Sequence, residues 1–144
     1  MVGIVIVAHT PLANAMFSFA EHTFGVLSEG IRAVDIPPYE DIKASFDRVM
    51  KATYGVNADS GVLILTDVMG ATPANVVSNL EVRGSLLGLN FPIVVLTGLN
   101  LPMLIRCISH RDTNLEGLAS KALQGGKNGI LRLGSQPHQE MTKK

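Results

Sequence analysis

The chain has 144 residues, of which 47% are hydrophobic and 17% are charged, and its 12 basic and 12 acidic residues give a formal net charge of zero. This composition is typical of one ordered globular domain and excludes a disordered chain. Because the charge is balanced and no cluster of Lys and Arg forms a basic stripe, no nucleic-acid partner is expected. No apolar stretch reaches the length of a membrane span, so no direct membrane insertion is expected.

The cysteine content and the N-terminal segment both favour a cytoplasmic location. Cys107 is the single cysteine, so no intrachain disulfide can form and an oxidising compartment gains no support. The apolar run that follows Met1 has no basic region before it and is too short for a secretory signal peptide.

Short runs of Val, Ile and Leu alternate along the chain with segments in which apolar residues recur at helical spacing. We expect residues 1–135 to form a single domain and residues 136–144 to form a polar tail, since no linker or internal repeat is present. The sequence predicts, in chain order, a strand over 2–8, a helix over 11–27, a strand over 31–36, a helix over 40–54, a strand over 61–66, a helix over 73–82, a strand over 93–97, a helix that begins after 98–100, a helix over 115–121 that ends by Gly125 and Gly126, and a short strand over 130–133.

This alternation predicts a three-layer, doubly wound α/β fold with a mostly parallel sheet of strand order 2-1-3-4. The strands read as buried on both faces, because they show no polar alternation. The short last strand at 130–133 is the odd element. We expect it to be an antiparallel edge strand of the same sheet or a strand that pairs with another subunit.

Two similar motifs mark the candidate site. The first apolar strand ends in His9, followed by Thr10 and Pro11, and the third ends in Asp67, followed three residues later by Gly70-Ala71-Thr72-Pro73. In strand order 2-1-3-4 the first and third strands are neighbours, so these two side chains meet where open α/β sheets bind ligands. Each Thr-Pro pair suits the N-cap and first position of a helix.

A histidine oriented by an aspartate can act as a nucleophile. If Asp67 accepts a hydrogen bond from one ring nitrogen of His9, the other nitrogen keeps its lone pair and faces outward. A phosphoryl group is the natural electrophile, because the amides of Gly70, Ala71 and Thr72 precede a helix and can hold an anion, with the Thr10 hydroxyl nearby. The plainer alternatives are a strand-end histidine with a satisfied hydrogen bond and a carboxylate that caps a loop. No metal or organic cofactor is expected, since the remaining histidines show no metal-ligand spacing.

The segments AHTPLA (8–13), LTDVMGATPANVV (65–77) and NLPM (100–103) resemble signatures of the mannose-type (mannose/fructose/sorbose) enzyme IIA domain of the bacterial phosphoenolpyruvate:sugar phosphotransferase system. The resemblance covers roughly residues 1–133. It implies a doubly wound fold in which His9 takes a phosphoryl group from the phosphocarrier protein HPr and passes it to a IIB domain, with Asp67 paired to it. It also implies a homodimer in which the strand at 130–133 crosses to the partner.

Three alternatives follow from the same sequence. A stand-alone IIA protein could be a regulatory module whose His9 phosphorylation state is read by a partner, or a phosphotransfer subunit of a dihydroxyacetone kinase. An unrelated flavodoxin-like nucleotide binder would need a G-x-G-x-x-G turn after the first strand, which AHTPLANA lacks.

We expect Cys107 to be an inert core residue, and Arg106 and Arg111 to lie on a solvated helix face or a basic rim.

Overall fold

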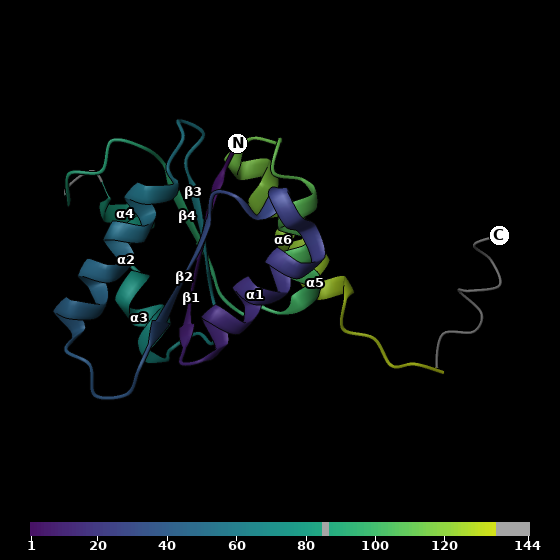
Figure 1. Cartoon of the computed structure of the whole chain (residues 1–144), viewed down its shortest axis with the longest axis horizontal. Coiled ribbons are helices and arrows are strands. Elements are labelled where there is room, and N and C mark those ends of the chain that lie inside the picture. The colour runs from purple at the N-terminus through teal and green to yellow at the C-terminus, as the bar shows by residue number, and fades with distance from the viewer. Residues whose placement is uncertain (85–86, 135–144) are drawn as a thin grey trace.

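The computed structural model of the chain describes residues 1–84 and 87–134, so the polar tail expected at 136–144 lies outside the described residues. Strands and helices alternate as the sequence predicts (Figure 1). In chain order they are β1 (Gly3–His9), α1 (Leu12–Phe24), the 3-10 helix η1 (Gly25–Ser28), β2 (Ile31–Ile36), α2 (Ile42–Val56), β3 (Val62–Thr66), α3 (Thr72–Val77), α4 (Leu80–Arg83), β4 (Ile93–Leu96), α5 (Leu101–Ser109) and α6 (Leu115–Asn128).

The sheet is parallel throughout its described part, and its strand order β2-β1-β3-β4 confirms the predicted topology. The register pairs Val7 of β1 with Thr66 of β3, and His9 with Ile36 of β2. Strands β1, β2 and β3 therefore finish close together at one edge, which is the lower end of the molecule in Figure 1.

Helices cover both faces of the sheet, which gives the three layers visible in Figure 1. Ile4, Ile6 and Leu65 pack beneath α1, α5 and α6. Val5 and Ile64 face the opposite side, beneath α2, α3 and α4. Each fully buried side chain of this kind stabilises the fold by about 1.5–3 kcal/mol relative to an exposed one. Burial on both faces explains why the strand sequences lack polar alternation.

Two predicted helices are interrupted in the structure. The helix expected over 11–27 ends as an α-helix at Phe24, because Gly25 adopts a positive φ of 58° and a 3-10 turn follows. The helix expected over 73–82 divides into α3 and α4. At the break the hydroxyl of Ser78 donates to the carbonyl of Asn75 at 3.2 Å, a local bond that competes with helical pairing.

The predicted helix end at Gly125 and Gly126 is wrong, because α6 continues through both glycines to Asn128. These glycines allow α6 to pack closely on α5. A Cβ atom at Gly125 would lie 2.7 Å from the Cβ of Arg106, and one at Gly126 would lie 3.2 Å from the Cε of Met103. The glycines therefore serve helix packing and not helix termination.

The strand predicted over 130–133 is not formed in this structure. Residues 130–134 pair with no strand among the described residues, and the chain leaves the body of the protein after α6 (Figure 1). Ile130, Leu131 and Leu133 are 76%, 59% and 90% exposed. Only the short connection over 110–114 separates α5 from α6, so α6 packs against α5 on one face of the sheet. The described segment after α6 continues outward from this helix layer and does not reach a sheet edge (Figure 1).

Arg111 contradicts the expectation of a solvated or rim position, because it is only 5% exposed. Its guanidinium contacts no carboxylate among the described residues and instead donates to four backbone carbonyls. These acceptors are Val2 at 2.8 and 3.0 Å, Leu27 at 2.9 Å, Glu29 at 2.5 Å and Gly30 at 3.3 Å. Arg111 thereby joins the N-terminal strand to the turn between η1 and β2.

Cys107 lies fully buried in α5, as expected for a core residue. Burial raises the pKa of its thiol to about 12, although the nearby positive charge of Arg111 acts in the opposite direction. The reactive thiolate is therefore scarce at neutral pH. Within the described ranges, the structure contains no helix that is both long and apolar enough to cross a bilayer.

Candidate functional site

His9 and Asp67 meet at the carboxyl edge of the sheet, as the topology predicts. His9 is the last residue of β1 and Asp67 follows directly after β3. The Nδ1 atom of the His9 ring lies 2.6 Å from Oδ2 of Asp67. The His9 side chain is 53% exposed and that of Asp67 is 7% exposed. The ring is thus accessible to a large partner, whereas the carboxylate beneath it is not.

Backbone amides hold the Asp67 carboxylate in place. Oδ2 accepts the amide of His9 at 3.0 Å, and Oδ1 accepts the amide of Val68 at 2.9 Å. Burial by itself would raise the pKa of Asp67, but the hydrogen bonds from the His9 amide, the His9 ring and the Val68 amide outweigh it and hold this pKa below its ordinary value. The carboxylate is therefore ionised at neutral pH.

An ionised carboxylate can only accept hydrogen bonds, so the hydrogen of the short contact resides on Nδ1 of His9. In the neutral ring the lone pair then belongs to Nε2. This arrangement leaves Nε2 as the nucleophilic atom of the half-exposed imidazole.

Two of the predicted phosphate-binding residues share a hollow with His9. Thr10 and Thr72 line the same depression, which has a volume of about 560 Å³. The rest of its lining comes from Ile36 at the end of β2, the loop residues 37–40 and Ile42 at the start of α2. The structure thus brings His9, Thr10 and Thr72 together, as the sequence predicts.

Gly70 and Ala71 do not line this hollow. They form the turn between β3 and α3, in which the Ala71 amide donates to the carbonyl of Val68 at 3.3 Å. In the described part of the chain, the amides of Gly70 and Thr72 have no hydrogen-bond acceptor, and the first amide bonded within α3 is that of Asn75. Of the three amides predicted to hold a phosphoryl group, those of Gly70 and Thr72 are therefore free, whereas that of Ala71 is already engaged.

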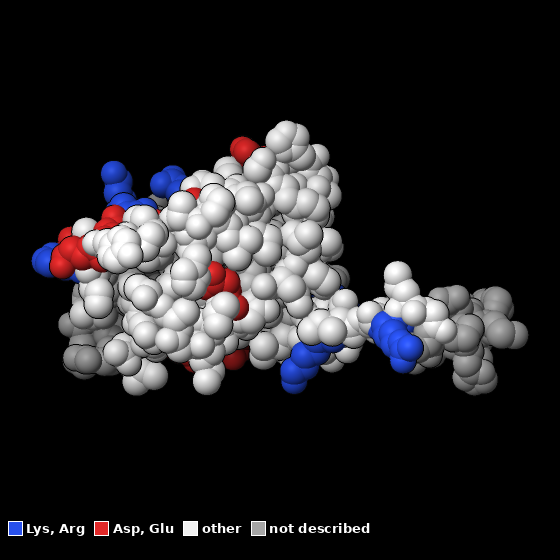
Figure 2. Space-filling model, turned by 90° about the horizontal axis from the view of Figure 1, so that it is seen from below, with Lys and Arg blue, Asp and Glu red and all other residues white. Residues whose placement is uncertain are grey.

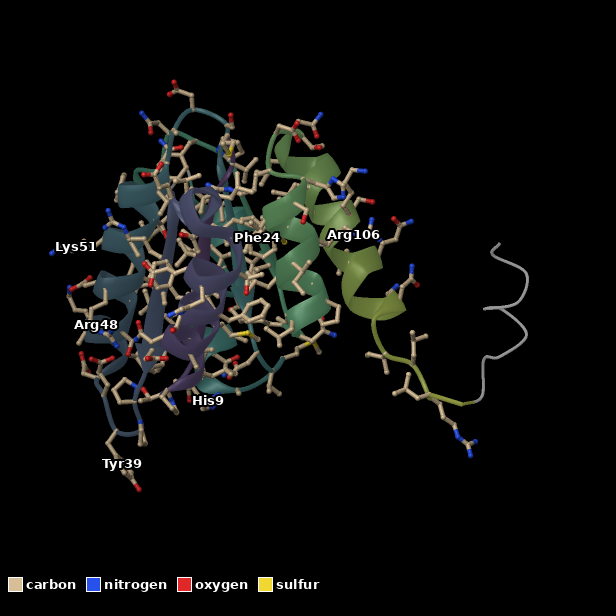
Figure 3. The ribbon with its side chains drawn as sticks, turned by 45° about the vertical axis from the view of Figure 1, so that its right-hand side comes forward. His9, Phe24, Tyr39, Arg48, Lys51 and Arg106 are labelled. Atoms are coloured by element: carbon tan, nitrogen blue, oxygen red, sulfur yellow. The ribbon has the colours of Figure 1, made fainter. Side chains whose placement is uncertain are left out.

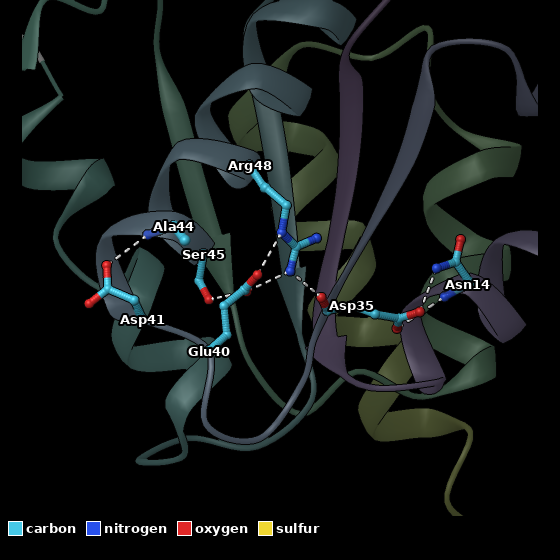
Figure 4. Close-up of polar contacts among 7 residues, drawn as sticks. All are labelled: Asn14, Asp35, Glu40, Asp41, Ala44, Ser45 and Arg48. Atoms are coloured by element: carbon cyan, nitrogen blue, oxygen red, sulfur yellow. Dashed lines mark hydrogen bonds and ion pairs between the residues drawn. The ribbon is translucent and has the colours of Figure 1, made fainter.

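The predicted helix caps at Thr10 and Thr72 are wrong. The Thr10–Pro11 peptide bond is cis and Pro11 is the N-cap of α1, while Thr72 is the first residue inside α3. The cap of α1 comes instead from β2, because one carboxylate oxygen of Asp35 accepts the amide of Ala13 at 2.8 Å. The other oxygen accepts the side-chain amide of Asn14 (Figure 4). Asp35 lies near the carboxyl end of a strand, as His9 and Asp67 do, so its position was visible in the sequence. No sequence pattern, however, predicts that it caps the start of α1.

A polar network that sequence reasoning missed braces the segment after β2. Glu40 accepts hydrogen bonds from Ser45 at 2.5 Å and from Arg48 at 2.7 and 3.2 Å. Arg48 also donates to the carbonyl of Asp35 at 2.6 Å, and Asp41 caps α2 by accepting the amide of Ala44 (Figure 4). The pKa of Glu40 lies below its ordinary value, mainly because its carboxylate accepts hydrogen bonds from Arg48 and, with a smaller effect, from Ser45.

The end of the molecule that carries His9 is largely uncharged. Figure 2 views this end and shows Lys and Arg mainly on the side of α2 and towards the C-terminal segment, with Asp or Glu also near the middle of the face. No cluster of three or more metal-ligating side chains occurs within residues 1–84 and 87–134. The site therefore offers a histidine nucleophile, an orienting carboxylate and backbone amides at an exposed surface.

A doubly wound sheet with a histidine–aspartate pair at its carboxyl edge places this protein among the open α/β domains that bind ligands at that edge. The sequence profile of the EIIA-man family, described as the PTS system fructose IIA component, matches residues 3–123. The chain belongs to this family, whose members are components of the sugar phosphotransferase system.

Known relatives agree with this assignment. The chain is 26% identical over 138 residues to the mannose-specific EIIAB component of the phosphotransferase system of Escherichia coli strain K12, and the match covers 94% of this chain but only 41% of that relative. Component EIIA from Streptococcus agalactiae has a similar structure, with a TM-score of 0.80 and 27% identity over 92% of this chain and 97% of that one. The mannose/sorbose specific IIA subunit from Enterococcus faecalis shares the fold, with a TM-score of 0.76 and 20% identity over 92% and 94% of the two chains.

Proposed function

We propose that this protein is a phosphohistidine carrier in which His9 accepts a phosphoryl group from HPr and passes it to a IIB component for sugar uptake. The observation that carries the proposal is the 2.6 Å contact between Nδ1 of His9 and the buried carboxylate of Asp67. This contact orients the ring and leaves Nε2 as the atom that reacts.

In the proposed step, the Nε2 lone pair of His9 attacks phosphorus in line with the donor's N–P bond. The Nε2–P bond forms as the donor bond breaks, and the electron pair of that bond returns to the donor imidazole. The ring of His9 gains positive character, which the Asp67 carboxylate balances through Nδ1–H. Transfer to the acceptor is a second exchange of the same kind. The acceptor attacks phosphorus, the Nε2–P bond breaks, and its electron pair returns to the ring of His9.

The negative oxygens of the phosphoryl group require donors close to Nε2. We assign this role to the free amides of Gly70 and Thr72 and to the hydroxyls of Thr10 and Thr72, two residues that line the hollow beside His9. The Ala71 amide can contribute only if its 3.3 Å bond to Val68 is exchanged for the phosphate.

The proposal extends to organisation and partners. Residues 1–135 form one IIA-like domain of a cytoplasmic protein. The curated relatives are named EIIAB components, and this chain spans 41% of their length, which supports a IIB acceptor for His9. We also propose a homodimer in which residues 130–133, exposed here, pair with the partner's sheet. The molar mass measured by light scattering should then be that of a dimer.

The test of the carrier function is intact mass after incubation with phosphoenolpyruvate, enzyme I and HPr. We expect one added phosphate that is lost in acid, absent from His9→Ala and present in His22→Ala. His22 is a suitable control because it lies on the exposed surface of α1 and bonds to the carbonyl of Ser18 within that helix. A folded His9→Ala protein that still takes up phosphate would refute the assignment.

A further inference from the structure

Tyr39 has an unusual environment for a large aromatic residue. Its relative exposure of 102% means that no described residue covers the ring. Its backbone has a φ of 71°, a left-handed conformation that a bulky side chain rarely adopts. Burial therefore provides no compensation for this strained conformation, and such positions cluster at functional sites.

Hydrogen bonds from α2 and to the end of β2 hold the loop at 37–41, which contains Tyr39, in this conformation. Glu40 is bonded to Ser45 and Arg48, and Asp41 caps α2. Arg48 also reaches back to the carbonyl of Asp35, so that it ties the end of β2 to the first turns of α2 (Figure 4). The tip of the loop is thus presented by a fixed support.

The loop lines the same hollow as His9. Figure 3 shows Tyr39 projecting from the same end of the molecule as His9 and extending beyond it. Further exposed apolar side chains belong to the same end: Ile42 at the start of α2 is 65% exposed, and Met69 in the loop after β3 is 82% exposed. Tyr39 and Ile42 line the hollow with His9, and Met69 belongs to the loop after β3, the neighbour of β1 on its other side. Exposed apolar side chains therefore come from the elements on both sides of the strand that carries His9.

Phosphoryl transfer between two proteins dictates what must cover this surface. The donor's phosphorus must come within about 3–3.5 Å of Nε2 of His9. A protein contact covers about 800 Å² on each partner, so the interface must extend from His9 over the adjoining loops. Exposed tyrosines are frequent anchors in such interfaces, because a rigid ring loses little entropy on binding.

We propose that Tyr39 is a docking residue for the phosphoryl donor, namely a phosphocarrier protein with an apolar surface around its own phosphohistidine. This inference rests on the proposed carrier function and adds the surface by which the donor is recognised. The Glu40 carboxylate accepts hydrogen bonds from Arg48 and Ser45 and is therefore not free to bind the partner. The loop instead presents an aromatic ring and apolar side chains.

The experiment compares Tyr39→Asn, Tyr39→Phe and wild type. Asn tolerates a positive φ, so Tyr39→Asn removes the ring and keeps the loop conformation. Two donors are used: phosphorylated HPr, and phosphoramidate, a small reagent that phosphorylates imidazole without needing a docking surface. We expect kcat/KM with phosphorylated HPr to fall about tenfold in Tyr39→Asn, mainly through KM, and to be nearly unchanged in Tyr39→Phe. The phosphoramidate rate should be the same in all three proteins.

Tyr54→Asn is the matched control, because Tyr54 is also an exposed tyrosine but lies in the last turn of α2, against Phe91. It should react normally with both donors. Wild-type kinetics of Tyr39→Asn with phosphorylated HPr would overturn the proposal, as would an equal loss with phosphoramidate or in Tyr54→Asn. If wild type gains no phosphate on His9 from either donor, the carrier function itself fails, which is a different result.

Discussion

At the scale of single residues, the carboxylate of Asp67 has two roles that its geometry separates. One oxygen receives both the ring and the backbone amide of His9, and the other receives the amide of Val68. The backbone bonds aim the carboxylate, and the ring bond sets the tautomer of the histidine. A residue of this kind acts on the nucleophile and contributes to the stability of the loop at the same time.

Asp67→Asn should lower the initial rate of phosphate uptake from phosphorylated HPr about 100-fold, because an amide neither balances the phosphorylated ring nor enforces the Nδ1–H tautomer. Mass spectrometry against time measures this rate. Asp59→Asn, in the loop before β3, is the control and should react normally. A wild-type rate in Asp67→Asn would contradict the orienting role.

The same variant should reveal a pH-dependent stability. The pKa of Asp67 is lower in the folded protein than its ordinary value of 3.8. Its ionised form therefore stabilises the fold fully above about pH 4, and this contribution disappears as the pH falls through the lower folded pKa. The difference in melting temperature between wild type and Asp67→Asn should accordingly narrow in acid. A difference that stays constant from neutral pH to acid would contradict this contribution.

At the scale of elements, the ion pair between Glu40 and Arg48 joins the loop after β2 to α2. The loop at 37–41 has no regular structure of its own, so its order depends on these side-chain bonds. Local openings of such a segment need not unfold the rest of the protein.

Arg48→Met should speed amide hydrogen exchange several-fold at Ala44 and Ser45, whose amides donate to Asp41 next to Glu40. It should leave the global unfolding transition nearly unchanged, because the ion pair is partly exposed. Hydrogen exchange followed by mass spectrometry measures the effect. Lys43→Met is the matched control, since Lys43 pairs with Asp47 within α2. Equal exchange in both variants would show that the ion pair does not brace the loop.

At the scale of the whole molecule, Arg111 links parts of the chain that lie far apart in sequence. It follows α5, and it binds the carbonyls that flank the beginnings of β1 and β2. Burial lowers the pKa of this guanidinium. Even so, an arginine stays protonated across the physiological range, so the charge that binds these carbonyls is retained.

Arg111→Met should reduce the free energy of unfolding by about 3 kcal/mol, because the change keeps an apolar stem but leaves several buried carbonyls without a donor. Urea denaturation measures the loss. Arg106→Met on α5 removes a more exposed charge and should cost less than about 1 kcal/mol. A loss in Arg111→Met as small as that in the control would mean that water replaces the guanidinium.

The sequence alone determined the architecture and the central pair of the candidate site. Uninterrupted apolar runs require strands buried on both faces, and helices between them require parallel crossovers. The order β2-β1-β3-β4 then makes the strands that end at His9 and Asp67 neighbours. Both conclusions depend on local patterns together with general rules of chain topology, which are visible without any coordinates.

The tertiary structure alone decided the features that depend on which surfaces meet. From the sequence Gly125 is expected to end a helix, whereas in the structure it packs against α5. From the sequence Arg111 is expected at the surface, whereas in the structure it binds carbonyls from distant parts of the chain. Asp35 caps a helix that precedes it in the chain, and Tyr39 shares a hollow with His9. None of these relations has a periodic signature, because each is a contact between segments whose separation in sequence is set by the fold and not by local propensity.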